Sequence, residues 1–409
     1  YNQLFFFSLS FKMWDENEPI LISNKKRITG YIYEELMMWH NSGTLSYSKY
    51  TEQLESWENS LTKSRLNGLL EVSGIKKYLK YIQARKANKN ELLRFHTDEY
   101  INKIINLSNG DGGNAGDVVR FGHGGYEIAR LSTGGILTAV EAIMSNDENI
   151  KIDNAYCLVR PPGHHAERDY GMGFCIFNNI VLGALHSRYL YQQQYPNQQF
   201  RIAIVDYDVH HGNGTQQAFW EDPDTLFICL HQDSNYPIGT GNINETGDPI
   251  KAPKSIINIP LPPGSGCGAY EYAFNHVVIP AIEQFQPHII FVSSGFDASF
   301  TDQLGAMMLS SESYRFMATK LLELSDKYCD GKIIFAHEGG YSKDYVPYCG
   351  LAVIETLVGM KTAVEDPYLH DCHRWGYQAL QYHQMKVIDK VWEIHQNKNN
   401  DNNNDNDDN

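Results

Sequence analysis

The spacing of apolar residues changes near residue 150, and each part of the chain predicts its own kind of secondary structure. Before that point apolar residues recur every three or four positions, which is typical of helices with one buried face. The spacing predicts mainly helical structure between residue 13 and about 110, and the matching segments are 30–40, 50–73, 97–108 and, further along, 126–144. The Gly-rich segment 110–125 shows neither a helix nor a strand pattern, so we expect a loop there.

After residue 150 the chain carries short apolar runs without polar alternation, as strands buried on both faces of a parallel sheet do. The runs cover residues 154–159, 201–206, 225–230, 255–259, 288–294 and 332–336. Segments with helical spacing separate several of them, at residues 177–192, 270–285 and 310–328. This alternation predicts an α/β fold with a central parallel β-sheet that is flanked by helices on both faces.

The pattern predicts a single large domain over residues 13–396. The apolar stretch 1–12 lacks the basic start and the cleavage site of a secretory signal, so we interpret it as a disordered or non-native extension. Residues 397–409 consist mostly of Asn and Asp, which predicts a disordered tail.

Charge and cysteine content narrow the classes of partner. Acidic residues outnumber basic ones by 49 to 34, and the formal net charge of -15 argues against direct binding of nucleic acid. The seven cysteines form no CxxC pair, which is typical of a reduced protein, so we expect an intracellular location in the cytoplasm, the nucleus or both. No apolar run reaches the roughly 20 residues of a membrane span, so no membrane partner is expected.

Ionisable residues and glycines follow the predicted strands at the ends where parallel sheets bind their ligands. Five of the runs continue into loops that carry His, Asp or Tyr, with the sequences RPPGHHAERDYGMGF, DYDVHHGNG, HQDSNYP, GFDAS and HEGGY. Convergence of five separate segments at one edge of a sheet predicts an active site.

The segment DYDVHHGNG supplies candidate metal ligands. Alternate side chains of an extended chain share a face, so Asp208 and His210 can point to one spot, with Asp206 behind them. Asp297 from another strand completes an Asp–His–Asp set, and three protein ligands with an open position are typical of catalytic zinc. Taken alone, a residue such as Asp297 is more often a turn or helix-capping residue.

Two carboxylate ligands weaken the acidifying effect of the ion, so a separate general base is useful. The pair His164–His165 lies between a Pro-Pro-Gly turn and a Gly-rich loop and is the candidate, although an isolated pair is usually a surface feature. Tyr341 can donate a hydrogen bond to an oxyanion, with packing over the preceding Gly turn as the alternative. Phe174 and Tyr236 are candidate channel walls, although such residues are singly more often core.

The segments RPPGHHAERDYGMGFCIFNN, VDYDVHHGNGTQ, SSGFDA and HEGGYS resemble the signature segments of the histone deacetylase superfamily. The segments HHGNGT, LPPGSG and YVPYCGLAVIE are most similar to those of class II members, above all to the bacterial histone deacetylase-like amidohydrolases. The resemblance covers residues 28 to about 370. It implies the single-domain arginase–deacetylase fold and a zinc-dependent hydrolase that splits an acyl-lysine amide into a carboxylate and free lysine.

The resemblance also implies a role for each position by residue match. The catalytic group comprises His164, His165, Tyr341 and Asp206, the last of which orients the first His. The zinc ligands are Asp208, His210 and Asp297. The substrate contacts are Phe174, Gly173, Tyr236 and Leu304. A structural potassium ion is expected at Asp206 and Leu230, together with the backbone of Asp208 and His210.

Some positions depart from the commonest family pattern. Asn213 stands behind the second His where some relatives have Asp, which predicts a less basic His165. Cys229 replaces a Ser that ligates potassium in the family, and sulfur suits a hard cation poorly, so we expect weaker potassium binding. We expect His165 to act as the base, because Asp206 should hold His164 in a more cationic state.

The resemblance leaves the substrate open. The main hypothesis is a protein-lysine deacetylase that acts on acyl-lysine proteins or peptides, histones among them, and so takes part in chromatin regulation. An acetylpolyamine or other small-molecule amidohydrolase would share the whole site and is the alternative. A non-catalytic metal-binding scaffold is disfavoured, because the ligands, the His pair and Tyr341 occur together. A homo-oligomer is compatible with the sequence.

Overall fold

The computed structural model of the chain describes residues 18–23, 25–45 and 54–396. The predictions for residues 1–12 and 397–409 lie outside these ranges. The described residues form an α/β fold around a central parallel sheet, which confirms the fold class that the alternation of strands and helices predicts.

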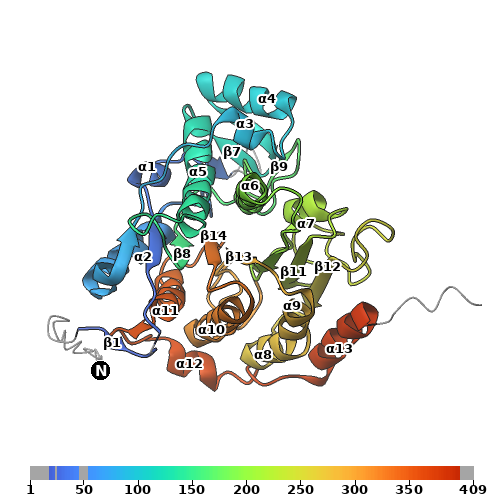
Figure 1. Cartoon of the computed structure of the whole chain (residues 1–409). Coiled ribbons are helices and arrows are strands. Elements are labelled where there is room, and N and C mark those ends of the chain that lie inside the picture. The colour runs from blue at the N-terminus through green and yellow to red at the C-terminus, as the bar shows by residue number, and fades with distance from the viewer. Residues whose placement is uncertain (1–17, 24, 46–53, 397–409) are drawn as a thin grey trace, which may run out of the picture.

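Eight strands form the central sheet, and each is parallel to its neighbours (Figure 1). In spatial order they are β12 (Ile256–Leu261), β11 (Thr225–Gln232), β10 (Ile202–Asp206), β13 (Ile289–Ser294), β14 (Ile333–His337), β8 (Asn154–Cys157), β2 (Thr29–Ile32) and β5 (Leu79–Tyr81). All six predicted apolar runs are strands of this sheet. Every residue of β8, β10, β13 and β14 is buried, because helices cover both faces.

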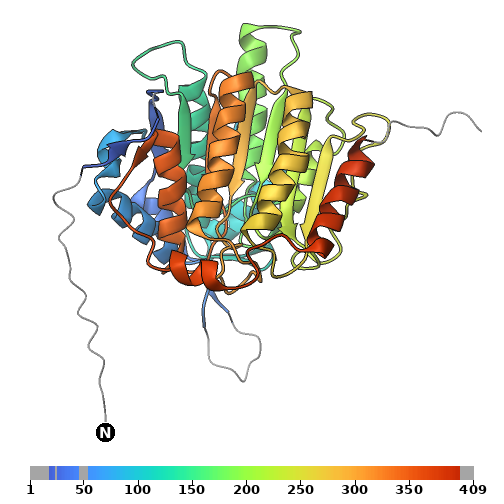
Figure 2. The ribbon, with the colours of Figure 1, turned by 90° about the horizontal axis from the view of Figure 1, so that it is seen from below.

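Two layers of helices cover the sheet, and each encloses its own apolar cluster. One layer contains α2 (Leu61–Val72), α8 (Cys267–Ala273), the π-helical turn η3 (Phe274–Val278), α9 (Ile279–Phe285), α10 (Ser311–Tyr328), α11 (Val346–Val358) and α13 (Tyr382–Gln396). Figure 2 shows α11, α10, the continuous α8–α9 helix and α13 side by side in front of the strands. The other layer contains α3 (Lys89–Leu92), α4 (Asp98–Asn109), α5 (Gly125–Ile143), α6 (Asn179–Gln194) and α7 (Asn213–Phe219).

Smaller elements complete the described ranges. They are α1 (Glu35–Met38), η2 (Ile75–Tyr78), α12 (Leu369–Arg374), the strand pairs β1 (Ile20–Leu21) with β15 (Met360–Lys361) and β3 (Thr44–Leu45) with β4 (Leu54–Glu55), and a small sheet of β7 (Val119–Phe121), β6 (Gly113–Asp117) and β9 (Gly171–Met172).

The N-terminal part differs from the sequence-based prediction. The predicted helix 30–40 is helical only over α1, and its first residues belong to β2, which extends the central sheet beside β8. So short an apolar run fits a buried strand and a helix equally well, and spacing cannot separate them. The predicted helix 50–73 begins only at Leu61, and residues 50–53 lie outside the described ranges.

The Gly-rich segment 110–125 contains β6 and β7, so the prediction of a loop without strands is wrong. The backbones of β6 and β9 approach closely: a Cβ at Gly116 would lie 2.0 Å from the carbonyl oxygen of Gly171. Glycine is therefore required in the strand, and a strand built from glycines shows no apolar alternation.

The strand order places a ligand site between β10 and β13. The chain continues from β10 outward through β11 and β12, and then returns to the other side of β10 to form β13 and β14. Strand order therefore reverses between β10 and β13, and open parallel sheets bind ligands outside the carboxyl ends of the strands at such a point.

Candidate metal centre and active site

The carboxyl ends of β10 and β13 bring three metal-ligating side chains together. Asp208 and His210 follow β10, and Asp297 follows β13. His210 Nδ1 lies 3.0 Å from Asp208 Oδ1 and 3.1 Å from Asp297 Oδ2, and the ligand atoms of all three residues lie within 4.8 Å of one another. Both carboxylates are fully buried. Two buried negative charges need a nearby cation, because their desolvation is otherwise too costly.

Two observations fit a metal ion at this place. The buried Oδ2 of Asp297 has no hydrogen-bond partner of acceptable geometry among the described residues. A Cβ at Gly339 would lie 2.2 Å from that oxygen and 2.7 Å from Asp208 Oδ2, so only glycine leaves the space open. Backbone N–H groups hold the other carboxylate oxygens: Val209 donates to Asp297 Oδ1 and Gly339 donates to Asp208 Oδ2, both at 2.9 Å. Two carboxylates and one imidazole are a donor set that suits zinc.

His164 and His165 lie beside these ligands and have different partners. His164 Nδ1 lies 2.9 Å from Asp206 Oδ2, whereas His165 Nδ1 lies 2.9 Å from Asn213 Oδ1. Burial lowers the pKa of His164, but the Asp208 and Asp206 carboxylates outweigh it and raise this pKa to about 10. Burial and the charge of His164 lower the pKa of His165 well below its usual value. The pair therefore consists of one cationic and one neutral imidazole, in the order expected from the sequence.

Aromatic side chains surround the outer side of the centre. The ring of Tyr341 lies 5.8 Å from that of Phe174 and 6.4 Å from that of His210, measured between centroids. The ring of Tyr236 lies 5.2 Å from that of His165. Burial raises the pKa of Tyr341 well above 10, so its hydroxyl keeps its proton and can donate it in a hydrogen bond. Phe174 and Tyr236 remain partly exposed beside the buried polar residues.

Gly173 allows the loop before Phe174 to pass close to the His pair. A Cβ at Gly173, whose φ is +49°, would lie 2.3 Å from His165 Cδ2. Phe174 itself has a φ of 68°, a conformation that is costly for a residue with a side chain and that clusters at functional sites. The loop is tied to Tyr236, whose hydroxyl accepts from Gly173 N–H at 3.1 Å and donates to Asp117 Oδ2 at 2.9 Å. Sequence reasoning left Asp117 without a role.

Two further carboxylates, the half-buried Asp302 and the buried Glu338, were missed by sequence reasoning and hold the loops of the site. Asp302 Oδ2 accepts from the Tyr341 N–H at 2.7 Å, and Oδ1 accepts from the N–H of the half-buried Leu304 at 2.9 Å. Glu338 accepts from the Gly163 N–H at 2.6 Å, directly before the His pair. Burial raises the pKa of both carboxyl groups to about 7. Their only signal in the sequence is an acidic residue beside a Gly-containing loop.

The predicted potassium residues lie on neighbouring strands. Asp206 ends β10 and pairs in register with Cys229 of β11, which precedes Leu230. Asp206 Oδ1 already accepts from the Asp208 N–H at 3.0 Å, and Oδ2 contacts His164. Burial raises the pKa of the Cys229 thiol well above its usual value, so its sulfur stays uncharged. The potassium site stays a prediction.

A buried ion cluster anchors the loop that carries the His pair. Arg160 lies just before this loop and is 1% exposed. Its Nε lies 2.9 Å from Glu58 Oε1, and its Nη1 donates to the backbone oxygen of His40 at 2.7 Å. Lys63 Nζ lies 3.2 Å from the same Glu58 oxygen. Burial raises the pKa of Glu58, but Arg160 and Lys63 outweigh it and lower this pKa to about 2.

Glu58→Ala is expected to lower the free energy of unfolding by about 3–5 kcal/mol, because two buried cations lose their counter-charge. Urea denaturation measures the change. Glu393→Ala is the matched control, since the Lys390–Glu393 pair is exposed and should contribute less than about 1 kcal/mol. Equal effects of the two substitutions would contradict the cluster's role.

The same cluster predicts a pH dependence. Glu58 is ionised in the folded state down to about pH 2, whereas in the unfolded chain it takes up a proton near its ordinary pKa of 4.5. Its contribution to stability is therefore complete above pH 4.5 and is lost as the pH falls toward 2.

One other group of described residues has the spacing of metal ligands, namely Glu91, Glu141 and His186. Arg85 Nη2 lies 2.6 Å from Glu91 Oε1 and 2.5 Å from Glu141 Oε1. The guanidinium already supplies the positive charge between the two carboxylates, so we place no metal there.

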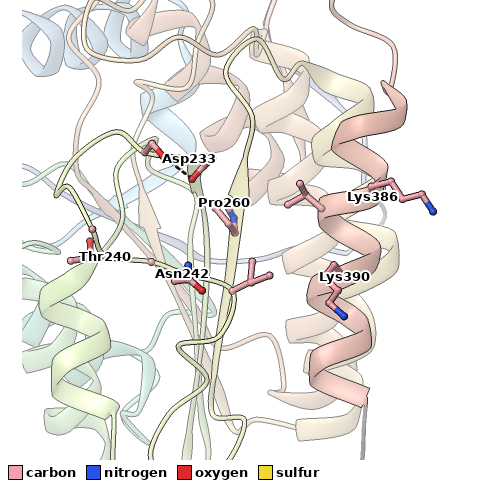
Figure 3. A pocket seen from close by; sticks show the side chains of 11 residues that line it. Asp233, Thr240, Asn242, Pro260, Lys386 and Lys390 are labelled. Carbon is pink, nitrogen blue, oxygen red and sulfur yellow. Dashed lines mark hydrogen bonds between the residues drawn. The ribbon is translucent and has the colours of Figure 1, made fainter.

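A separate groove of about 480 Å³ lies between α13 and the loop after β11 (Figure 3). Lys386 and Lys390 project from α13 on one side, and Asp233, Thr240 and Asn242 lie on the other. Among the described residues, no group with metal-ligand spacing lines it. The reactive side chains are therefore gathered at the strand ends and not in this groove.

Comparisons with known proteins identify the family of the chain. The family model of the histone deacetylase domain matches residues 54–357. The chain is 40% identical over 348 residues to the histone deacetylase-like amidohydrolase of Pseudomonas aeruginosa, covering 83% of this chain and 89% of that protein. It is 32% identical over 342 residues to a probable deacetylase of Archaeoglobus fulgidus, with 83% and 89% covered. The crystal structure of the HDA15 HD domain superposes with a TM-score of 0.75 at 27% identity, covering 90% of this chain and 94% of that one.

These matches define a hydrolase of the deacetylase and amidohydrolase type. The chain belongs to the histone deacetylase family, which confirms the resemblance that the signature segments indicate. Within the part of the chain that the structure describes, no helix is long and apolar enough to span a membrane.

Proposed function

We propose that the chain is a zinc-dependent deacylase that removes acetyl and related acyl groups from the ε-amino group of lysine in proteins or peptides. The observation that supports this proposal is the convergence of the Asp208–His210–Asp297 ligand set with the His164–His165 pair. A metal site for structure alone would need neither the His pair nor a buried tyrosine beside it.

The ligand set formed by Asp208, His210 and Asp297 would hold the zinc ion, which supplies Lewis-acid chemistry for amide hydrolysis when it is bound. A structural potassium ion at Asp206 and Leu230 belongs to the same proposal. The uncharged thiol of Cys229 makes that second site weak.

Different side chains then carry out the separate proton-transfer and charge-stabilising steps of amide hydrolysis. His165 is neutral, so its Nε2 can take the proton of the attacking water as the new C–O bond forms. Tyr341 donates its hydroxyl proton in a hydrogen bond to the oxyanion that develops on the carbonyl. His164, whose pKa is raised by the Asp208 and Asp206 carboxylates, keeps positive charge near the reacting atoms. The imidazole pair returns the proton to the leaving nitrogen as the C–N bond breaks, which yields a carboxylate and the free amine.

The residues around the centre suit a lysine stem. The partly exposed rings of Phe174 and Tyr236 provide apolar faces against which the methylene groups of lysine can pack. The net charge of -15 favours cationic substrates such as basic peptides, histone tails among them. All seven cysteines are free thiols, which supports an intracellular reaction, in the cytoplasm or the nucleus.

The test is a mass-spectrometric panel of acetyl-lysine peptides, longer acyl-lysine peptides and N-acetylpolyamines. We expect deacetylation of the acetyl-lysine peptides, loss of this activity after treatment with a chelator, and recovery on addition of zinc. Turnover of the acetylpolyamines alone would indicate that the substrate is a small molecule and not a protein. Absence of turnover of any substrate by the zinc-loaded protein would overturn the proposal.

A further inference from the structure

The side chain of Asn213 links the carboxylate of Glu167 to the ring of His165. We propose that Glu167 is a positioning residue that sets the tautomer of His165 through Asn213. The inference rests on the proposed function, in which His165 takes up a proton at Nε2. It adds a residue to the catalytic machinery that does not touch the substrate or the metal ligands.

Asn213, the first residue of α7, connects the two side chains. Its Oδ1 lies 2.9 Å from His165 Nδ1, and its Nδ2 donates to Glu167 Oε1 at 2.8 Å. The same Nδ2 faces two further acceptors, the backbone oxygen of His165 at 3.4 Å and the sulfur of Met172 at 3.3 Å. Every group around the amide nitrogen of Asn213 is thus an acceptor.

This arrangement determines which way the amide faces. A carboxylate oxygen only accepts hydrogen bonds, so the NH₂ group of Asn213 must face Glu167 and its oxygen must face His165. The imidazole then has to donate from Nδ1, which leaves the lone pair on Nε2. With the amide turned over, Asn213 would donate to Nδ1, the ring proton would sit on Nε2, and His165 could accept no proton there.

The position of Glu167 suits an indirect role. It is half-buried at the edge of a surface pocket of about 430 Å³, whose lining also includes Asn213, Gln217 and Glu221. Its second oxygen is 3.4 Å from Gln217 Nε2. In relatives with Asp at position 213 a carboxylate would contact the imidazole directly. Here the neutral Asn213 contacts the imidazole, and the carboxylate of Glu167 fixes the orientation of the Asn213 amide.

The first variant is Glu167→Gln, which keeps the size of the side chain but can offer Asn213 either an oxygen or an NH₂ group. Both amide orientations then become available, and part of the protein carries His165 as the unproductive tautomer. We expect kcat to fall about twofold with KM nearly unchanged, because two equally populated orientations leave about half of the protein with the productive tautomer. The assay uses the substrate of the panel that is turned over fastest.

The second variant is Asn213→Asp, which places a second carboxylate against Glu167 at the present 2.8 Å contact. We expect a loss of similar size, because the two carboxylates repel or share a proton. The double variant Glu167→Gln with Asn213→Asp should recover the kcat of the unchanged protein, since Gln donates to Asp and Asp accepts from His165. A residue that only supports the loop predicts added losses and no recovery.

Glu221→Gln is the matched control. Glu221 lines the same pocket, and its ion pair is with Lys251 and not with Asn213. It should leave kcat and KM unchanged. Thermal melting of each variant separates a loss of activity from a loss of folded protein.

A readout without any substrate is ¹⁵N NMR of the protein with labelled histidine rings. His165 should show the Nδ1–H tautomer in the unchanged protein and a mixture of tautomers in Glu167→Gln. A retained Nδ1–H tautomer in that variant, or a double variant no better than its single parents, would overturn the inference. If no acyl-lysine substrate is hydrolysed, the proposed function fails. The NMR result still tests whether Glu167 sets the tautomer of His165.

Discussion

Asp297→Ala is expected to leave the protein without bound zinc and to lower its hydrolytic rate by more than about 10³-fold, since metal catalysis contributes several kcal/mol to such reactions. Asp297 is the proposed ligand that follows β13, and its Oδ2 is the buried oxygen without a hydrogen-bond partner of acceptable geometry among the described residues. With alanine only Asp208 and His210 remain, and two ligands do not retain the ion. Elemental analysis of the dialysed protein measures the zinc content.

Two controls separate metal loss from misfolding. Asp297→Asn keeps an oxygen that can accept from the Val209 N–H, a bond of 2.9 Å in the structure, but lacks the negative charge that binds the ion. It should therefore fold like the unchanged protein and still lose zinc. Asp330→Ala removes an exposed carboxylate paired with Lys332 and should retain both zinc and activity. Stoichiometric zinc in dialysed Asp297→Ala would refute the ligand assignment.

Tyr341→Phe is expected to lower kcat about 10²-fold and to change KM little, by analogy with the removal of one oxyanion donor. The substitution removes only the hydroxyl. The ring remains, so its packing against Phe174 at a centroid distance of 5.8 Å and the hydrogen bond from the Tyr341 N–H to Asp302 are kept. Steady-state kinetics on the substrate of the panel that is turned over fastest measures both constants.

Tyr33→Phe is the control for the loss of a tyrosine hydroxyl, because the Tyr33 hydroxyl donates to the exposed carboxylate of Glu35, which has no part in the proposed site. Its kinetic constants should match those of the unchanged protein. If Tyr341→Phe also kept its full kcat, Tyr341 would have no part in stabilising the oxyanion, and its role would be limited to packing against Phe174.

The strands at the centre of the sheet were predictable because burial on both faces leaves a continuous apolar run, as in β10 and β13. The strands at one side were not. β2 is four residues long and continues almost directly into α1, so its apolar residues could be read as part of a helix. β6 contains glycines where its backbone approaches Gly171, and close contact between backbones has no hydrophobic signal.

The residues of the candidate site also differ in whether the sequence could predict them. The convergence of Asp208, His210 and Asp297 was predictable, because strand alternation and the position of strand ends place them without knowledge of any loop. Asp302 and Glu338 were not, because each acts through backbone N–H groups that only the folded loops bring within reach. The low basicity of His165 was predicted from Asn213, but burial and the charge of His164 are its main causes, and the hydrogen bond with Asn213 acts in the opposite direction.

The order of the strands also bears on how the protein becomes active during its synthesis. The His pair follows β8, two of the proposed zinc ligands follow β10, the third follows β13, and Tyr341 follows β14, so the centre draws on residues 164 to 341. Because β14 pairs with both β13 and β8, the middle of the sheet cannot close until late in translation. Contacts between such distant parts of a chain form slowly and expose apolar strands in the meantime. We therefore expect a ribosome-bound chain that stops before β14 to show no hydrolytic activity, because the strand that joins β8 to β13 is missing.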